Sequence, residues 1–280
     1  MNPPSDLPHS IYAANTHEVQ NQPCELGDYN LYVSDTVLRE AVHREGAAWA
    51  DKNLQTFGER IGRADYLELG SLANAFIPEF DSHDRFGHRI DRVRFHPAYH
   101  TLMQTAIEEG LHASPWVEPR PGAHVARAAK FLLHSQVEAG HGCPITMTFA
   151  CLPALRQQPE LAALWEPRIT ARHYDPANVP MAQKRGITIG MAMTEKQGGS
   201  DVRANSTTAT PVNQPGAGQM YSLVGHKWFL SAPMCDVFLI LAQTTAGVSC
   251  FAVPRWLPDG TKNALNVIRL KDKMGNKSNA

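Results

Sequence analysis

The stretch Met191-Ala-Met-Thr-Glu-Lys-Gln-Gly-Gly-Ser-Asp201 joins an apolar beginning to a polar end that contains two adjacent glycines. The β-branched and apolar residues at 187–193 predict a strand that runs into a loop. The glycines would allow backbone N–H groups in this loop to turn inward and approach an anion closely. Thr194 and Ser200 add hydroxyl groups that can donate hydrogen bonds to carbonyl or phosphate oxygens. An ordinary polar β-turn fits the same residues, and the spacing alone favours that simpler interpretation.

A second informative stretch is His226-Lys-Trp-Phe-Leu-Ser231. Adjacent Trp228 and Phe229 on a strand would place one aromatic ring on each face of a sheet. One ring could then pack in the core while the other lies against a planar ligand. Simple packing of both rings explains the pattern as well, and these residues alone favour it.

The part of the chain after Gly186 has the pattern of a β-domain. Short β-branched or threonine-rich runs alternate with turns there, which is typical of an antiparallel sheet or barrel rather than βαβ units. Gly225 separates two of these runs in the way expected for a β-hairpin. The predicted strands cover residues 187–193, 203–212, 220–224, 227–231, 237–243, 248–253 and 265–270.

Residues 35–171 show the helical period instead. Ser34 or Asp35 can cap a first helix, and apolar residues share one helical face between residues 122 and 140. Strand signals are sparse in this half. The segment 172–186 is polar and contains two prolines, so we interpret it as a connection between domains.

These patterns predict an α+β, multidomain fold, in which an N-terminal all-α domain precedes an antiparallel β-barrel or sheet domain. We assign residues 1–27 to a polar N-terminal arm, which contains four prolines. Residues 28–180 are assigned to the helical domain and residues 181–280 to the β-domain.

The composition is that of a folded globular protein. Among the 280 residues, 43% are hydrophobic and 19% are charged, which excludes general disorder. The formal net charge of −1 argues against a strongly basic nucleic-acid-binding protein. The longest apolar run, residues 237–242, is too short to span a membrane and no signal peptide is visible, so we expect a cytoplasmic protein without a membrane partner. The five cysteines are odd in number and widely spaced, which indicates reduced thiols.

The usual motifs of several enzyme classes are missing: there is no GxxxxGK[ST] phosphate loop, no strand–helix GxGxxG, and no HExxH, GxSxG or CxxC. His134, Glu138 and His141 have a spacing that a helix would align, so a metal could bind there. A solvated helix face explains the same spacing, and we favour it. The same interpretation applies to His96 and His100. We therefore predict no metal site.

Three segments together resemble signatures of the acyl-CoA dehydrogenase flavoproteins. Residues 191–201, MAMTEKQGGSD, look like A-M-T-E-x-x-x-G-S-D, and residues 223–231, LVGHKWFLS, resemble N-G-x-K-x-W-I-T/S. The ending KDKMGNKS at 271–278 is similar to the family's closing segment, K-x-G-x-R-x-S. Their order and separation also agree with the family. The segments that resemble its alkylation-response (AidB-type) branch are 30–35, 93–100 and 136–149, and the similarity runs from residue 27 to residue 280.

The resemblance implies an N-terminal helical domain, a middle β-domain and a C-terminal four-helix domain, with FAD as the cofactor. Thr194 would bind the pyrimidine edge of the flavin, and Ser231 would hydrogen-bond to N5, the atom that receives hydride. Gly199 and Ser200 would hold the pyrophosphate region. Phe229 stands where most family members have the Trp that packs on the flavin. The implied cofactor-binding residues are Met191, Met193, Thr194, Gly199, Ser200, Phe229, Leu230 and Ser231.

The family reaction removes a proton from Cα and a hydride from Cβ of an acyl-CoA thioester, with a carboxylate as the base. In most members the base is a Glu on the C-terminal helical domain, which we expect to be absent from a chain that ends at Ala280. The resemblance therefore implies an FAD-dependent acyl-CoA dehydrogenase-type oxidoreductase, with weak or no activity in this chain alone. We assign no catalytic residue, because Glu195 does not stand at the family's base position.

Two alternatives remain open. Relatives in the alkylation-response branch are linked to DNA, which implies a DNA-associated protective flavoprotein with little turnover. Because the charges are balanced, we expect DNA binding by this region to be weak and salt-sensitive. The other alternative is an inactive fragment whose only role is subunit contact. The resemblance also implies a homo-oligomer, which is a tetramer in the family.

Overall fold

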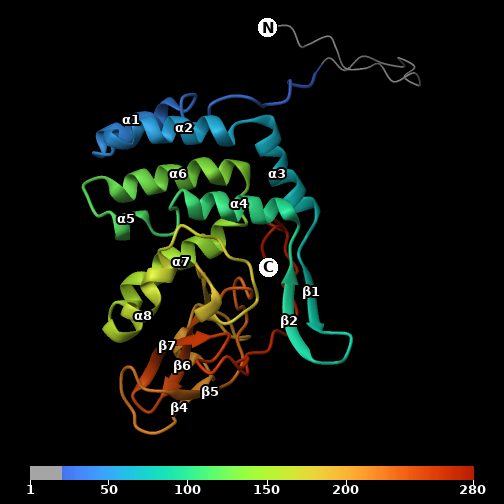
Figure 1. The fold of residues 1–280 in the computed structure, drawn as a ribbon, viewed down its shortest axis with the longest axis vertical. Coiled ribbons are helices and arrows are strands. Elements are labelled where there is room, and N and C mark those ends of the chain that lie inside the picture. Colours follow the sequence, from blue (N-terminus) through green and yellow to red (C-terminus); the bar gives the residue numbers. More distant parts are fainter. Residues whose placement is uncertain (1–20) are drawn as a thin grey trace.

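The structure, a computed structural model, describes residues 21–280. Of the predicted N-terminal arm, residues 1–20 therefore lie outside the described residues, and residues 21–26 are exposed. The helices are α1 (Thr36–Arg44), α2 (Asp51–Ile61), α3 (Ala64–Ala75), α4 (Pro97–Glu108), α5 (Ser114–Val117), α6 (Ala123–Val137), α7 (Gly142–Leu155) and α8 (Pro159–Ile169). Figure 1 shows α1 to α6 stacked at one end of the molecule and the main sheet at the other, with α7 leading from one to the other. The predicted order, a helical part followed by a sheet domain, is confirmed.

Local signals explain where several helices begin. The Asp35 carboxylate accepts a hydrogen bond from the backbone N–H of Leu38 at 2.8 Å, so Asp35 is the N-cap of α1. Helix α6 begins after Gly122, whose φ of 74° lies in the left-handed region. A Cβ at this glycine would lie 2.4 Å from the carbonyl oxygen of Gly46, so no other residue fits there without a shift of the backbone.

A charged hairpin projects from the helical part and was not expected from the sequence. Its strands, β1 (Glu79–His83) and β2 (Arg89–Arg94), are antiparallel. Asp81 pairs with two arginines of the opposite strand, Arg92 at 2.8 Å and Arg94 at 2.9 Å. The prediction of few strands in this half missed the hairpin, because cross-strand ion pairs rather than apolar alternation mark it. The hairpin runs alongside the sheet domain in Figure 1.

The main sheet is mixed. Strand β6 (Val237–Thr244) lies at its centre and is buried along most of its length. Antiparallel pairs join β6 to β7 (Gly247–Pro254) and β4 (Thr208–Pro211) to β5 (Tyr221–Val224), as predicted for this domain. Strands β3 (Ile189–Ala192) and β4, in contrast, lie parallel to β6. The long connection between β3 and β6 permits this, because parallel neighbours need a crossover of about a dozen residues or more.

Two predicted strands are absent from the part of the chain that the structure describes. Residues 227–231 do not pair with β5 across Gly225, because their backbone bonds return to the end of β3. The N–H of Ser231 donates to the carbonyl of Met191 at 3.1 Å. Residues 265–270 also form no strand, and the Val267 carbonyl instead accepts from Arg89 of the hairpin at 2.6 Å.

Helices α7 and α8 attach the helical part to the sheet. Their apolar residues, including Leu152 and Trp165, form one cluster with Ile189 of β3 and Val237 of β6. Thr148 adds a polar link, because its hydroxyl oxygen accepts from the N–H of Ile189 at 3.0 Å. No helix within residues 21–280 is both long enough and apolar enough to cross a membrane.

The segment 172–186, predicted as a polar connection, is anchored in the interior at one point. The Lys184 ammonium is 6% exposed and lies 2.7 Å from a carboxylate oxygen of Asp236, just before β6. Asp236 also accepts from the N–H of Thr188 at 2.9 Å. The segment therefore fixes the start of β3 against the start of β6.

Candidate functional site

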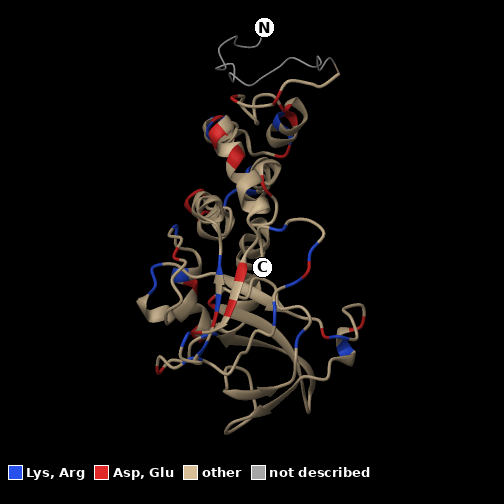
Figure 2. Cartoon of the chain, turned by 90° about the vertical axis from the view of Figure 1, so that its right-hand side faces the viewer, with Lys and Arg blue, Asp and Glu red and all other residues tan. Residues whose placement is uncertain are grey.

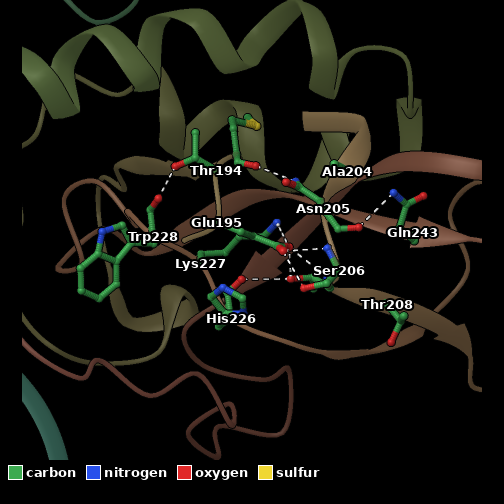
Figure 3. A network of polar contacts seen from close by, with 12 residues as sticks. Thr194, Glu195, Ala204, Asn205, Ser206, Thr208, His226, Lys227, Trp228 and Gln243 are labelled. Atoms are coloured by element: carbon green, nitrogen blue, oxygen red, sulfur yellow. Dashed lines mark hydrogen bonds and ion pairs between the residues drawn. The ribbon is translucent and has the colours of Figure 1, made fainter. Parts of the chain in front are cut away.

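The loop that follows β3 lies against residues 226–231, so the two stretches singled out in the sequence meet. Thr194 makes most of this contact: its hydroxyl donates to the carbonyl of Trp228 and accepts from the N–H of Phe229 at 3.0 Å. The N–H of Trp228 in turn donates to the Thr194 carbonyl at 3.0 Å. Figure 3 shows Thr194 and Trp228 facing one another. The contact holds the loop and the aromatic segment in one fixed arrangement.

Glu195 lies beneath this contact and is fully buried. Its carboxylate accepts from the N–H of Ser206 at 2.7 Å, from the N–H of Thr207 at 2.9 Å and from both of their hydroxyls. The Lys227 ammonium also lies 3.0 Å from this carboxylate (Figure 3). Burial opposes ionisation of Glu195, but the hydrogen bonds from Thr207 and Ser206 outweigh it and hold the pKa well below its usual range. An ionised carboxylate with all its partners in place cannot serve as a base, so Glu195 fixes the loop.

A second set of bonds ties the same loop to the sheet. The Asn205 amide donates to the carbonyl of Met193 at 2.8 Å, and Gln243 of β6 donates to the carbonyl of Asn205 at 3.1 Å (Figure 3). These contacts fix residues 193–205 as a rigid element although only a few of them belong to a helix or strand. The sequence does not reveal them, because Gln243 is 38 positions from its partner Asn205.

Five of the predicted cofactor residues divide into two groups, according to whether their side chains pack in the core or lie outside it. Met191, Met193 and Leu230 pack against the apolar clusters, so they would meet a cofactor mainly through their backbone. Phe229 is 49% exposed and Ser231 is half-buried, and both present side-chain atoms outside the core.

Gly199 and Ser200 are exposed at the end of the loop. A Cβ at position 199 would lie 2.5 Å from the Thr194 methyl carbon, so a glycine is needed where the loop folds back on Thr194. The structure thus joins Thr194 and Gly199 in one contact and gives Ser200 no bond to either.

An open groove of about 1600 Å³ borders the aromatic segment. Strands β5 and β7 and residues 263–272 line it together with Trp228 and Phe229. Leu230 and Lys271 also line the groove, so Ser231 lies next to its wall. The two aromatic rings are stacked with their centroids 5.7 Å apart.

Three cations surround these rings, and no role for any of them was predicted from the sequence. Lys196 and Arg269 lie 5.7 Å and 5.5 Å from the centre of the Trp228 ring, and Lys271 lies 5.1 Å from the centre of the Phe229 ring. Lys271 Nζ also donates to Ser231 Oγ at 3.1 Å. Burial lowers the pKa of Lys271. Lys196 and Lys271 lie in the sequence segments 191–201 and 271–278, but the bond of Lys271 to Ser231 could not be predicted because 40 residues separate the two.

His134, Glu138 and His141 form a buried network, so the interpretation of a solvated helix face is wrong. Helix α6 ends at Val137, and the extended backbone at Glu138 brings the three side chains together between α6 and α7. His134 Nδ1 and His141 Nε2 are 2.8 Å apart, and His141 Nδ1 lies 3.0 Å from Glu138. The Tyr66 hydroxyl lies 2.9 Å from the other nitrogen of His134.

The electrostatics of this network follow from burial and hydrogen bonding. Burial lowers the pKa of His134 well below its usual range. For Glu138, burial acts to raise the pKa, but hydrogen bonds from the His141 side chain and backbone prevail and lower it to about 2. Within residues 21–280 no group of three or more candidate ligands is arranged to hold a metal ion.

His96 and His100 also have structural roles. His96 is the N-cap of α4 and accepts from the N–H of Ala98 at 3.2 Å, while its ring stacks on Phe76. His100 lies 2.9 Å from the hydroxyl of Tyr174, which fixes the connecting segment against α4.

Comparisons with known proteins agree with this architecture. Residues 21–176 match the model of the adaptive response protein AidB N-terminal domain, and residues 190–280 match that of the acyl-CoA dehydrogenase middle domain. The AidB protein of Escherichia coli (strain K12) is 53% identical over 267 residues, which are 95% of this chain and 49% of that protein.

Two solved structures share the fold over nearly the whole chain. The Bd2924 apo-form superimposes with a TM-score of 0.80 and 30% identity, over 93% of this chain and 52% of that one. Caenorhabditis elegans ACDH-11, solved in complex with C11-CoA, gives a TM-score of 0.77 and 28% identity, over 96% of this chain and 48% of that one. The chain thus spans about half the length of the relatives it matches. From the two domain matches and the E. coli relative, we conclude that the chain belongs to the AidB branch of the acyl-CoA dehydrogenase family.

Proposed function

We propose that the protein is an FAD-dependent oxidoreductase that acts on CH–CH groups of acyl-CoA thioesters. The observation that carries this proposal is the contact between the loop after β3 and residues 228–231. It joins the Thr194 hydroxyl to the backbone of Trp228 and Phe229, while Ser231 pairs with Met191 at the end of β3, so Thr194, Phe229 and Ser231 belong to one rigid support.

The hydrogen-bonding capacity of these groups fits a flavin. Ser231 Oγ accepts from Lys271, and its own O–H has no acceptor among residues 21–280, so this donor is available for flavin N5. Thr194 uses its O–H on Trp228 and one lone pair on Phe229, which leaves a second lone pair for an N–H on the pyrimidine edge. Gly199 and Ser200 remain our proposal for the pyrophosphate region.

FAD, when bound, supplies the acceptor of the hydride from Cβ. The residues of this chain would bind and orient that ring: Ser231 would donate to it, Phe229 would pack against it and exclude water, and the buried Glu195 network would keep the loop from moving. No residue of the chain is assigned to removal of the Cα proton, since the hydrogen-bonded carboxylate of Glu195 is unavailable. We propose an acyl-CoA substrate because ACDH-11, a structural relative, was solved with C11-CoA.

Titration with FAD followed by acyl-CoA tests this function. Protein expressed from its complete reading frame should quench flavin fluorescence at a stoichiometric end point. Anaerobic addition of C11-CoA should then bleach the bound flavin. A protein that stays colourless after incubation with excess FAD would contradict the proposal.

A DNA-associated protective role with little turnover is the second candidate. The match to the adaptive response protein AidB N-terminal domain favours it. Figure 2 shows acidic and basic residues interspersed along the chain. We therefore propose that any contact of these residues with duplex DNA is weak and is lost as the salt concentration rises. Tight binding at physiological salt, measured by fluorescence anisotropy, would contradict this expectation.

A further inference from the structure

Lys271 has no counter-charge, in contrast to two buried lysines of the same domain. Lys184 pairs with Asp236 at 2.7 Å, and Lys227 pairs with Glu195 at 3.0 Å. Lys271 forms no ion pair within residues 21–280, and its one hydrogen bond goes to the neutral hydroxyl of Ser231. A partly desolvated ammonium with two unused donors is unfavourable unless an anion or a strong dipole meets it.

The position of Lys271 shows where such a partner would lie. The ammonium lies next to Ser231 Oγ and beside the ring of Phe229, and the residue lines the open groove. Lys273, two residues further on, is different, because its ammonium donates to the carbonyls of Asn276 and Asn279. Lys271 thus has unused donors beside the groove, next to the free O–H of Ser231.

The bond between Lys271 and Ser231 also sets the direction of the serine proton. An ammonium group can only donate, so Ser231 Oγ must act as the acceptor in this pair. The single O–H of Ser231 is then directed away from Lys271. Lys271 therefore orients the hydrogen-bond donor that the proposed function assigns to flavin N5.

We propose that Lys271 is a positioning residue that directs the Ser231 hydroxyl and places a positive charge beside the flavin ring, so that reduction of the ring is favoured. This inference rests on the proposed function. A hydride carries two electrons and one proton from the substrate Cβ to N5, while the Cα proton goes to a carboxylate base and a C=C bond forms. The ring thereby gains one negative charge, which a neighbouring ammonium stabilises more than it stabilises the neutral oxidised ring.

The test compares Lys271→Met and Lys271→Arg in protein expressed from its complete reading frame and loaded with FAD. The midpoint potential of the bound flavin is measured by slow enzymatic reduction in the presence of a reference dye. For Lys271→Met we expect the equilibrium constant for two-electron reduction to fall about tenfold, which is a shift of about 30 mV to more negative potential. Lys271→Arg keeps the charge, so its equilibrium constant for two-electron reduction should stay within about threefold of that of the unmodified protein. Lys52→Met, an exposed change on α2 with the same loss of charge, should not shift the potential.

The outcomes separate this inference from the proposed function. If the unmodified protein binds no FAD, the proposed function and the inference both fail. If it binds FAD and Lys271→Met has an unchanged potential, only the role of Lys271 is overturned. If Lys271→Met does not fold, Lys271→Gln replaces it as a neutral side chain that can still donate. A lowered potential in that variant then supports the inference, and an unchanged potential overturns it.

Discussion

Thr194 and Trp228 are hydrogen-bonded to each other in both directions: the Thr194 hydroxyl donates to the Trp228 carbonyl, and the Trp228 N–H donates to the Thr194 carbonyl at 3.0 Å. This double contact joins two loops that are 34 positions apart in the chain. It leaves Phe229 exposed beside the loop and brings Ser231 to the end of β3. Because neither loop is regular secondary structure, the geometry of the proposed flavin site depends on such individual contacts.

Ser231→Ala should weaken FAD binding. The substitution removes the donor assigned to N5 and leaves a polar atom of the ring unpaired, which costs about 1–3 kcal/mol, or roughly 5- to 150-fold in affinity. Fluorescence titration measures this change, and the absorption spectrum of the bound flavin should shift as well. Thr208→Ala is the control, because Thr208 is exposed on β4 and its hydroxyl reaches only the Val224 carbonyl at 3.4 Å. Equal affinity and identical spectra for both variants would show that N5 does not lie at Ser231.

Thr207, which lies just before β4, is unsuitable as a control. Its N–H and hydroxyl both donate to Glu195, so a change at this position would disturb the loop. Strong local signals, in contrast, predicted correctly: a cap at Ser34 or Asp35, of which the structure uses Asp35, and the apolar run of β6 need no knowledge of distant residues. What the sequence could not show are partners far along the chain, such as Lys271 for Ser231.

The buried histidine network illustrates the same limit. The spacing of His134, Glu138 and His141 fits a continuous helix, which is the structure that it predicted. Helix α6 instead ends at Val137, one residue before Glu138, because the Glu138 carboxylate accepts from the N–H groups of Gly140 and His141, at 2.6 Å and 2.9 Å. Local hydrogen bonding of a side chain to the backbone thus competes with helix continuation, and a periodic pattern does not record that competition.

Glu195→Gln should destabilise the fold. The change removes a buried charge that balances Lys227 and replaces one acceptor oxygen by a donor, which should cost about 3–5 kcal/mol in the free energy of unfolding. Urea denaturation measures this loss. Glu118→Gln is the matched control, because the ion pair of Glu118 with Arg172 is exposed and contributes at most about 1 kcal/mol. A loss below about 1 kcal/mol for both variants would show that the buried pair does not stabilise the fold.

Buried His112 should make stability depend on pH below neutrality. Burial lowers its pKa to about 4, and its Nε2 lies 3.1 Å from the Ala171 carbonyl. The unfolded chain, with a histidine pKa of about 6.5, then binds the proton more readily than the folded chain. The contribution of neutral His112 to the free energy of unfolding is complete above pH ~6.5. It falls by about 1.4 kcal/mol for each pH unit as the pH drops toward 4.

The measurement is urea denaturation at several pH values between 7 and about 4. His112→Gln should reduce the slope of unfolding free energy against pH by the equivalent of about one proton. Some slope should remain, because burial also lowers the pKa of His134. A slope that does not differ between His112→Gln and the unmodified protein would mean that His112 has the same proton affinity in both states.

Gly199→Ala should weaken FAD binding with little effect on the fold. A Cβ at this position would lie 2.5 Å from the methyl carbon of Thr194, so Thr194 must move and its bonds to Trp228 and Phe229 must stretch. Losing the alignment of about one hydrogen bond corresponds to roughly a tenfold lower affinity. The exposed loop end and the ordinary φ of Gly199 keep the change in unfolding free energy below about 1 kcal/mol. Gly275→Ala is the control, since open space surrounds that position, and an FAD affinity equal to the control's would show that the contact between Gly199 and Thr194 does not shape the site.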